Sequence, residues 1–248
     1  MTEHSTIRSD RELQDAVITY LTDGGLRQSP QTYLPLLPKQ AQRAGKFARF
    51  LARRYYRDRL ARSFRYSRTF AAPAESIVDT SAFDRFLDEC VLGSYRAAVR
   101  VGEMAMRELT RVAAAGPWWS ELLEYERLFF LQAATAENAA PAESLRAGPS
   151  ACCRTFCWYL PDLLRRLKSG EPVDEELQQD VTLVFSRSHD GRIYVAQVDE
   201  ITAAVFHAAD GRRNLLQIAE ATSLSSAEVQ RTADALRQIG ALVTSSRA

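Results

Sequence analysis

The chain has 248 residues, of which 46% are hydrophobic and 25% charged, and this balance excludes a disordered or fibrous protein. Its net charge of +1 provides no global field that would direct it to nucleic acid or to a membrane surface. No apolar run reaches the roughly 20 residues of a membrane span and the N-terminus holds no apolar signal core, so we expect a cytoplasmic protein with four reduced cysteines.

The charge is unevenly distributed along the chain. Between Lys39 and Arg68 there are eleven basic residues and a single acid, Asp58, which gives this segment +10 and leaves −9 for the remainder. Two interpretations stay open. The segment is either a solvated helix face whose arginines pair with acids elsewhere in the fold, or a docking surface for nucleic acid, an acidic protein, or an acidic peptide or its C-terminal carboxylate.

The first half of the chain has the apolar spacing of helices. Within the basic segment, Phe47, Phe50, Leu51, Leu60 and Phe64 are predicted to line a buried face. Residues 1–135 are therefore expected to form a helical domain. Its helices are predicted over residues 10–22, 40–68 (as one helix or two short ones), 80–92 and 93–114, and after the helix-opening Pro117.

The second half changes character. Residues 136–180 are predicted to be an irregular connector, with a possible short helix over residues 155–168. Residues 181–187 and 192–198 alternate like the two strands of a β-hairpin. Three capped helices and a final strand are expected to follow. The helix caps are Asp199, Asn214 and the capping box of Ser225 and Glu228, and the final strand covers residues 241–244.

The predicted fold is mainly α, with a helical N-terminal domain followed by a small winged-helix-like α+β domain over residues 181–248.

A winged-helix domain can bind either of two kinds of ligand, DNA or a peptide. For DNA, the third helix would be the recognition helix, but its four charged residues over 226–239 sum to zero. For a peptide, an exposed strand edge would accept an added strand, which requires no particular charge. A purely structural use, such as dimerisation, is a third possibility. The residues predicted to bind a peptide are Val181, Leu183, Phe185, Val229, Thr232, Ala233 and Leu236.

The sequence lacks the motifs of a catalytic or metal site. His4, His189 and His207 are far apart and form no metal-ligand pair. The CCxxxC spacing of Cys152, Cys153 and Cys157 matches no zinc or iron–sulfur pattern, so these cysteines are expected to pack, as is Cys90; in a helix, Cys153 and Cys157 would share a face. The acids Glu121, Glu124 and Glu126 are expected to be solvated. We therefore predict no catalytic residue and no metal ligand, while an independent enzyme that uses one of the three clustered cysteines remains an alternative.

Four stretches resemble one known family. They are FARFLARRYYRDRLARSFRYSR (47–68), AFDRFLDECVLGSY (82–95), PWWSELLEYERLFFL (117–131) and LVFSRSHDGRIYVAQVDEITAAVFHAADGRRNLLQIAE (183–220). Together they resemble the MbnC-like family of helical partner proteins, which are encoded beside TIM-barrel iron oxygenases that modify ribosomal peptides. The likeness is greater to the TglI-like branch of 3-thiaglutamate biosynthesis than to the methanobactin branch.

The resemblance implies a heterodimer in which a TIM-barrel iron enzyme, similar to TglH or MbnB, holds the iron and performs the oxygen chemistry. The chain itself would hold no cofactor. Its helical domain would pack against the barrel, and its C-terminal domain would resemble the elements that recognise peptide leaders. A TglI-like complex would oxidise a cysteine at the C-terminus of a carrier peptide and excise its β-carbon as formate, whereas an MbnC-like complex would form oxazolone and thioamide groups.

The basic segment has a candidate role in such a complex. Arg49, Arg53 and Arg57 are at helical spacing, and arginine binds carboxylates bidentately, so we expect them to contact the partner or the carboxylate of the substrate. Nucleic acid and membrane are not expected as partners. The main alternative function is a winged-helix DNA-binding transcription regulator with a helical sensor domain.

Overall fold

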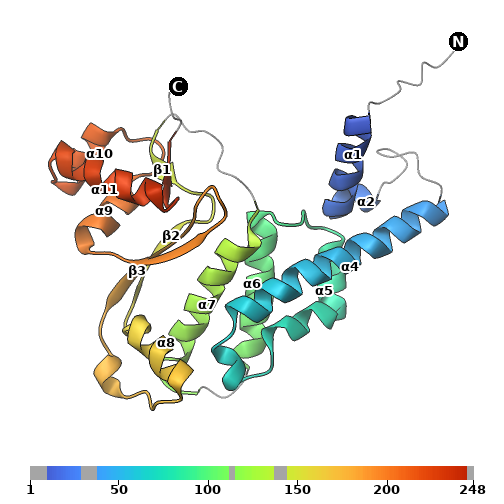
Figure 1. Cartoon of the computed structure of the whole chain (residues 1–248), viewed down its shortest axis with the longest axis horizontal. Coiled ribbons are helices and arrows are strands. Elements are labelled where there is room, and N and C mark those ends of the chain that lie inside the picture. The colour runs from blue at the N-terminus through green and yellow to red at the C-terminus, as the bar shows by residue number, and fades with distance from the viewer. Residues whose placement is uncertain (1–9, 29–37, 112–114, 137–143, 245–248) are drawn as a thin grey trace, which may run out of the picture.

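The computed structural model describes residues 10–28, 38–111, 115–136 and 144–244, and it is mainly helical with a small antiparallel sheet (Figure 1). Among these residues no helix is both long enough and apolar enough to cross a membrane. The helical half comprises α1 (Asp10–Thr22), α2 (Gly24–Gln28), α4 (Pro38–Ser63), α5 (Ser81–Leu87), α6 (Tyr95–Leu109) and α7 (Trp119–Ala134), with the 3-10 turns η1 (Ser67–Thr69) and η2 (Ala74–Asp79).

The basic segment forms one long helix, α4. Its buried stripe is Tyr56, Leu60 and Phe64, spaced four residues apart and each 0% exposed. These side chains recur on one face because a helix turns once in about 3.6 residues. The predicted burial of Phe47 and Phe50 is wrong, since they are 52% and 57% exposed in the N-terminal half of α4, on the side away from the main core.

The helices after α4 complete the larger core. Thr80 and Ser94 cap α5 and α6 by accepting hydrogen bonds from the amides of Phe83 and Ala97. Helix α7 packs against both α4 and α6 and buries Leu122 and other apolar residues on the faces turned toward them.

The connector is more regular than predicted. It contributes β1 (Arg146–Ala147), β2 (Cys152–Phe156), α8 (Leu160–Ser169) and the 3-10 turn η3 (Glu175–Leu177). The expected short helix begins later, because β2 extends to Phe156 and pairs with β3. Gly170, with φ +72°, ends α8 in the left-handed conformation that glycine adopts readily.

The predicted hairpin and the three helix caps are confirmed. Asp199 accepts from the amide of Thr202, and Asn214 and Ser225 each form a capping box, with Gln217 and Glu228 respectively. The elements are β3 (Val181–Arg187), β4 (Ile193–Gln197), α9 (Glu200–Ala208), α10 (Leu215–Thr222), α11 (Ser226–Gln238) and β5 (Leu242–Val243).

The C-terminal half is an antiparallel sheet of order β2-β3-β4 followed by three helices. The final strand, β5, pairs with β1 and not with the hairpin. The two faces of the sheet belong to different cores. Leu183 and Phe185 of β3 pack into the core of the helical half, while Val184 points to the opposite face and packs with α9–α11. The sheet therefore joins the two halves of the molecule (Figure 1).

Candidate functional site

The predicted peptide contacts on β3 lie inside the structure. Val181, Leu183 and Phe185 are 3%, 3% and 0% exposed and belong to the larger core. β3 is also the central strand, since Leu183 pairs with Arg154 of β2 on one side and with Gln197 of β4 on the other. Neither the side chains of these three residues nor an edge of this strand is available to a peptide.

The predicted contacts on α11 divide into two pairs. Val229 and Ala233 are 0% exposed and pack in the smaller core beneath the helix. Thr232 and Leu236 line a groove on the neighbouring face of α11, and Leu236, which is 2% exposed, also packs in the smaller core. Two of the four residues predicted on α11 therefore line the groove, together with Glu228, Arg231 and Ala235, which were not predicted.

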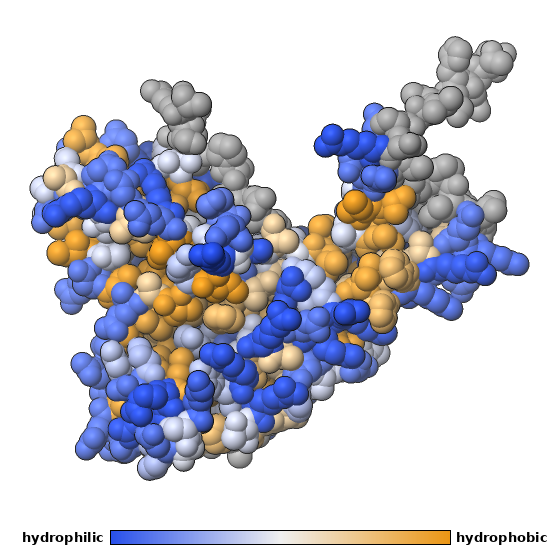
Figure 2. All heavy atoms as spheres, in the orientation of Figure 1, coloured by the Kyte–Doolittle hydropathy of each residue, from blue (hydrophilic) through white to orange (hydrophobic). Residues whose placement is uncertain are grey.

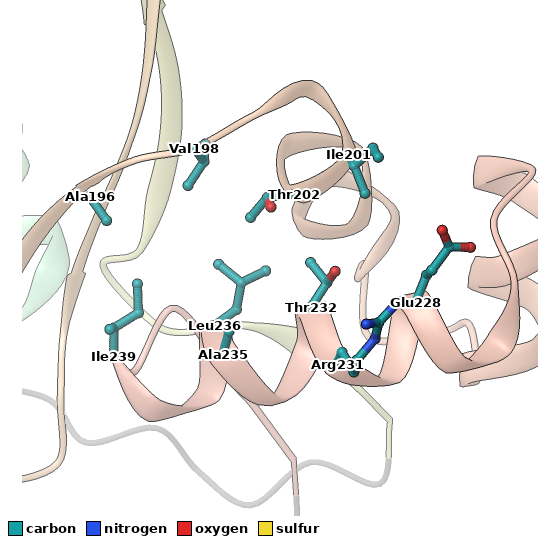
Figure 3. Close-up of a pocket in the computed structure, with 10 residues that line it drawn as sticks. All are labelled: Ala196, Val198, Ile201, Thr202, Glu228, Arg231, Thr232, Ala235, Leu236 and Ile239. Atoms are coloured by element: carbon teal, nitrogen blue, oxygen red, sulfur yellow. The ribbon is translucent and has the colours of Figure 1, made fainter.

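The groove lies between β4, the start of α9 and the length of α11, and has a volume of about 510 Å³ (Figure 3). In Figure 3, Thr232 and Leu236 point up from α11 toward Val198 and Thr202 on the opposite wall. The lining is largely apolar, and Figure 2 shows hydrophobic surface gathered where the sheet meets the C-terminal helices. The lining residues are Ala196, Val198, Ile201, Thr202, Glu228, Arg231, Thr232, Ala235, Leu236 and Ile239.

Strand β4 forms one edge of the sheet, and no described strand pairs with its outer side. The amide of Val198 donates to the carbonyl of Thr182 on β3. Because hydrogen-bonding groups alternate along an antiparallel strand, the amides and carbonyls of Ile193, Val195 and Gln197 point away from β3. These outward groups run beside the groove, so a strand added there would have the groove on one of its faces.

No described strand pairs with the outer edge of β2 either, and the same alternation points the backbone groups of Cys153 and Thr155 outward. The two edges differ in that only the edge of β4 lies beside the groove. Its walls include Ala196 and Val198 from β4 and its flank, and no residue of β2. In the sequence, this site is indicated by the strand-like alternation of residues 192–198. That alternation places the side chains of Tyr194, Ala196 and Val198 on the same face of the strand.

The charges along α11 cancel one another. Arg237 donates to Asp234 at 2.6 Å, and hydrogen bonds from Gln230 and Arg237 lower the pKa of the Asp234 carboxyl. At the groove, Glu228 faces the same hollow as Arg231, so the lining has no net charge. A helix with this balance lacks the positive surface that phosphate contacts require.

Arg49, Arg53 and Arg57 lie on one face of α4, and each already has an acidic partner. Arg49 donates to both carboxylate oxygens of Asp88 at 2.8 Å, and Arg57 donates to Asp79 at 2.5 Å. Arg53 is paired with Asp84 in the same way. These pairs match the interpretation of a helix face compensated by acids elsewhere in the fold.

Cys152 and Cys153 pack against the two cores as expected, but the expectation of packing is wrong for Cys157, which is exposed after the end of β2. Cys152 and Cys153 are neighbours on β2, so their side chains point to opposite faces of the sheet. Burial raises the pKa of the Cys152 thiol to about 11, and the Glu121 carboxylate raises that of the exposed Cys157. All of these shifts favour the protonated thiol, which is a poor nucleophile. The buried Cys90 packs in the core, as predicted.

The three acids of α7 have structural partners, and the expectation that they are solvated is wrong for Glu126. Glu121 accepts hydrogen bonds at 3.0 Å from the amides of Cys157 and Trp158. Glu124 pairs with Arg127 at 2.7 Å. Glu126 is 0% exposed, and its burial raises the pKa of the carboxyl to about 7.

Within the described ranges, no group of three or more His, Cys, Asp or Glu residues could hold a metal ion. His4 lies outside those ranges.

No model of a known protein family matches the chain, and no curated protein matches it. The groove and the outer edge of β4 lie side by side in the C-terminal half of the molecule.

Proposed function

We propose that this chain is a non-metal accessory subunit of an iron-dependent peptide-modifying oxygenase, and that it holds the carrier peptide while a partner subunit oxidises it. The observation that carries the proposal is the open edge of β4 beside an apolar groove. An edge strand presents a row of free amides and carbonyls, and a neighbouring groove gives alternate side chains of an added strand a place to bind.

The geometry indicates how the peptide would be held. Outward backbone groups of Ile193, Val195 and Gln197 would pair with the peptide backbone, which gives affinity with little dependence on sequence. Every second peptide side chain would enter the groove between Val198 and Leu236, where apolar residues are preferred. Ordering an extended segment in this way would position its reactive residue for the partner.

The part played by the partner rests on the resemblance to the MbnC-like family. A partner similar to TglH would supply iron and oxygen chemistry, and for a TglI-like complex the reaction is the excision of the β-carbon of a C-terminal cysteine with loss of formate. This chain would contribute binding and orientation only. This division is supported by the pKa of each clustered thiol, which lies above its ordinary value and so favours the poorly nucleophilic protonated form.

A second surface supports a large partner. Val17 and Ile18 of α1, with Phe47 and Phe50 of α4, are 40–59% exposed. Figure 2 shows hydrophobic surface over α1 and the N-terminal half of α4. Contiguous apolar surface of this kind marks protein interfaces in soluble proteins. We assign it to the iron enzyme, whose contacting surface would be apolar with an acidic rim, because α4 also carries exposed basic residues such as Arg43 and Lys46.

The test is native purification of the tagged chain from the cells that produce it, with iron analysis and intact-mass measurement of everything that elutes with it. We expect an iron-loaded partner in a one-to-one ratio and a bound peptide. Thr232→Trp would fill the groove, so this variant should retain the partner and lose the peptide, while the control Gln238→Trp, on the same helix but outside the groove, should retain both. Elution as a metal-free homodimer with DNA would contradict the proposal.

A further inference from the structure

A second hollow lies at the other end of β4. It has a volume of about 690 Å³ and is formed by the end of α4, by α7 and by the turn of the β3–β4 hairpin. Ile193, the first residue of β4, belongs to its wall. Its charged lining residues are Asp58, Arg59, Arg62, Arg65 and Arg187, so four positive charges face one negative charge. We call this hollow the basic cleft.

Two of the four arginines are fixed by neutral acceptors. Arg59 donates from Nε to the carbonyl of Ala133 at 2.8 Å, and Arg187 donates to the carbonyl of Thr135. Both carbonyls lie at the C-terminal end of α7. These carbonyls carry no formal charge, and the partial negative charge at the end of α7 stabilises the two guanidinium groups in place, so each keeps its formal positive charge at the cleft wall.

The other two arginines are exposed. Arg62 lies in the last turn of α4, and Arg65 follows the helix and stacks over the ring of Tyr66 at 4.7 Å. Among the described residues, none of the four cleft arginines forms an ion pair with a carboxylate. Arg49, Arg53 and Arg57 are each paired with an aspartate, so the cleft arginines differ from them in having no carboxylate partner.

The cleft and the groove are connected by one strand. β4 runs from Ile193 at the cleft to Gln197 beside the groove, a length of roughly 17 Å for five residues at about 3.3 Å each. A peptide that pairs with the free edge of β4 and fills the groove must therefore reach the basic cleft within about six residues.

We propose that the basic cleft binds carboxylates of the same peptide, so that the chain selects a peptide with an apolar anchor at one end of the β4-bound segment and an acidic group at the other. This inference rests on the proposed function. Arg62 and Arg65 bind the carboxylate, because their guanidinium groups are exposed and able to make bidentate contacts, while Arg59 and Arg187 add fixed positive charge. The carboxylates come from Asp and Glu side chains or from the C-terminus of the peptide.

The probe is a displayed library of random peptides of about fifteen residues, long enough to span β4 and both hollows. Selection is carried out on the full chain, on Arg62→Glu/Arg65→Glu, and on Arg54→Glu/Arg107→Glu. The last pair changes the net charge equally, and its two residues are exposed on α4 and α6, outside the cleft. A fourth arm uses Thr232→Trp, which blocks the groove but leaves the cleft intact.

We expect peptides selected on the unmodified chain to combine an apolar anchor with acidic residues about six positions away. Their synthetic forms should bind Arg62→Glu/Arg65→Glu about tenfold or more weakly and bind the control pair within about twofold. Replacing Asp and Glu with their amides, or amidating the C-terminus, then separates the two sources of carboxylate. Circular dichroism establishes that each variant is folded.

Two failures are distinguishable. Peptides that bind through the groove, lose binding with Thr232→Trp and show no acidic preference would overturn the basic cleft while leaving the proposed function intact. Peptides that bind equally well to Thr232→Trp, or the absence of any selected peptide, would overturn the groove and with it the proposed function. Equal weakening by the cleft pair and by the control pair would overturn the inference by showing a general charge effect.

Discussion

Glu126 offers a quantitative test of the core, because its carboxylate is buried between α7 and the chain that follows α4. It is 0% exposed and accepts hydrogen bonds from the amides of Tyr66 and Ser67, the first at 2.6 Å. Burial raises the pKa of this carboxyl from 4.5 to about 7, which means that desolvation outweighs the hydrogen bonds that favour the charged form.

The sign of the pH effect follows from the two pKa values. Between about pH 4.5 and 7 the unfolded chain has released the proton of Glu126, whereas the folded chain still holds it. The free energy of unfolding therefore falls as the pH rises through this window. The difference between pKa values of about 7 and 4.5 corresponds to a total loss of about 3 kcal/mol, most of it between pH 5 and 8.

Glu126→Gln isolates this contribution. Glutamine is neutral at every pH and can still accept the hydrogen bond of the Tyr66 amide through Oε1. Urea unfolding of both proteins, followed by circular dichroism between pH 5 and 8, should show that the unmodified chain loses about 2–3 kcal/mol relative to the variant. Carboxyls with lowered pKa, such as those of Asp199 and Asp234, act equally in both proteins and cancel. Parallel curves at all pH values would refute the reasoning.

Three further outcomes are expected. Asp199→Ala should lower the free energy of unfolding by about 1 kcal/mol, because it removes the cap of α9; a loss near zero in urea unfolding would show that the cap is dispensable. Phe185→Ala should cost about 3–5 kcal/mol, because Phe185 is fully buried and packs with Tyr125 and Phe156 between the sheet and α7; an unchanged thermal midpoint would contradict this packing. Iodoacetamide should alkylate Cys157 more slowly at neutral pH than an unshifted cysteine, because Glu121 raises the pKa of its thiol, and faster alkylation would restore the alternative of an independent cysteine enzyme.

The helices and their ends were predictable from local signals. Asp199, Asn214 and Ser225 each stand directly before an apolar periodic run, and a cap depends on neighbours only three residues away. The hairpin over residues 181–198 was predictable for the same reason, since strand alternation and a tight turn are local properties.

Long-range pairing was not predictable. Cys152–Phe156 becomes a strand because it pairs with β3, and this pairing places β3 in the centre of the sheet and makes β4 an edge. The burial of Phe47 and Phe50 was wrongly expected because helical spacing identifies a stripe, but not which stripe meets the core. The aspartates that pair with Arg49, Arg53 and Arg57 lie 22–39 residues further along the chain, beyond any local pattern.

The most direct measurement of the central claim is amide hydrogen exchange of the chain with and without the peptide recovered from native purification. Pairing on β4 predicts slowed exchange at Ile193, Val195 and Gln197, whose amides point outward, and unchanged exchange at Cys153 and Thr155 on the outer edge of β2. Slowed exchange at the β2 pair alone, or no change at either edge with the peptide bound, would contradict the assignment of β4 as the strand that accepts the peptide.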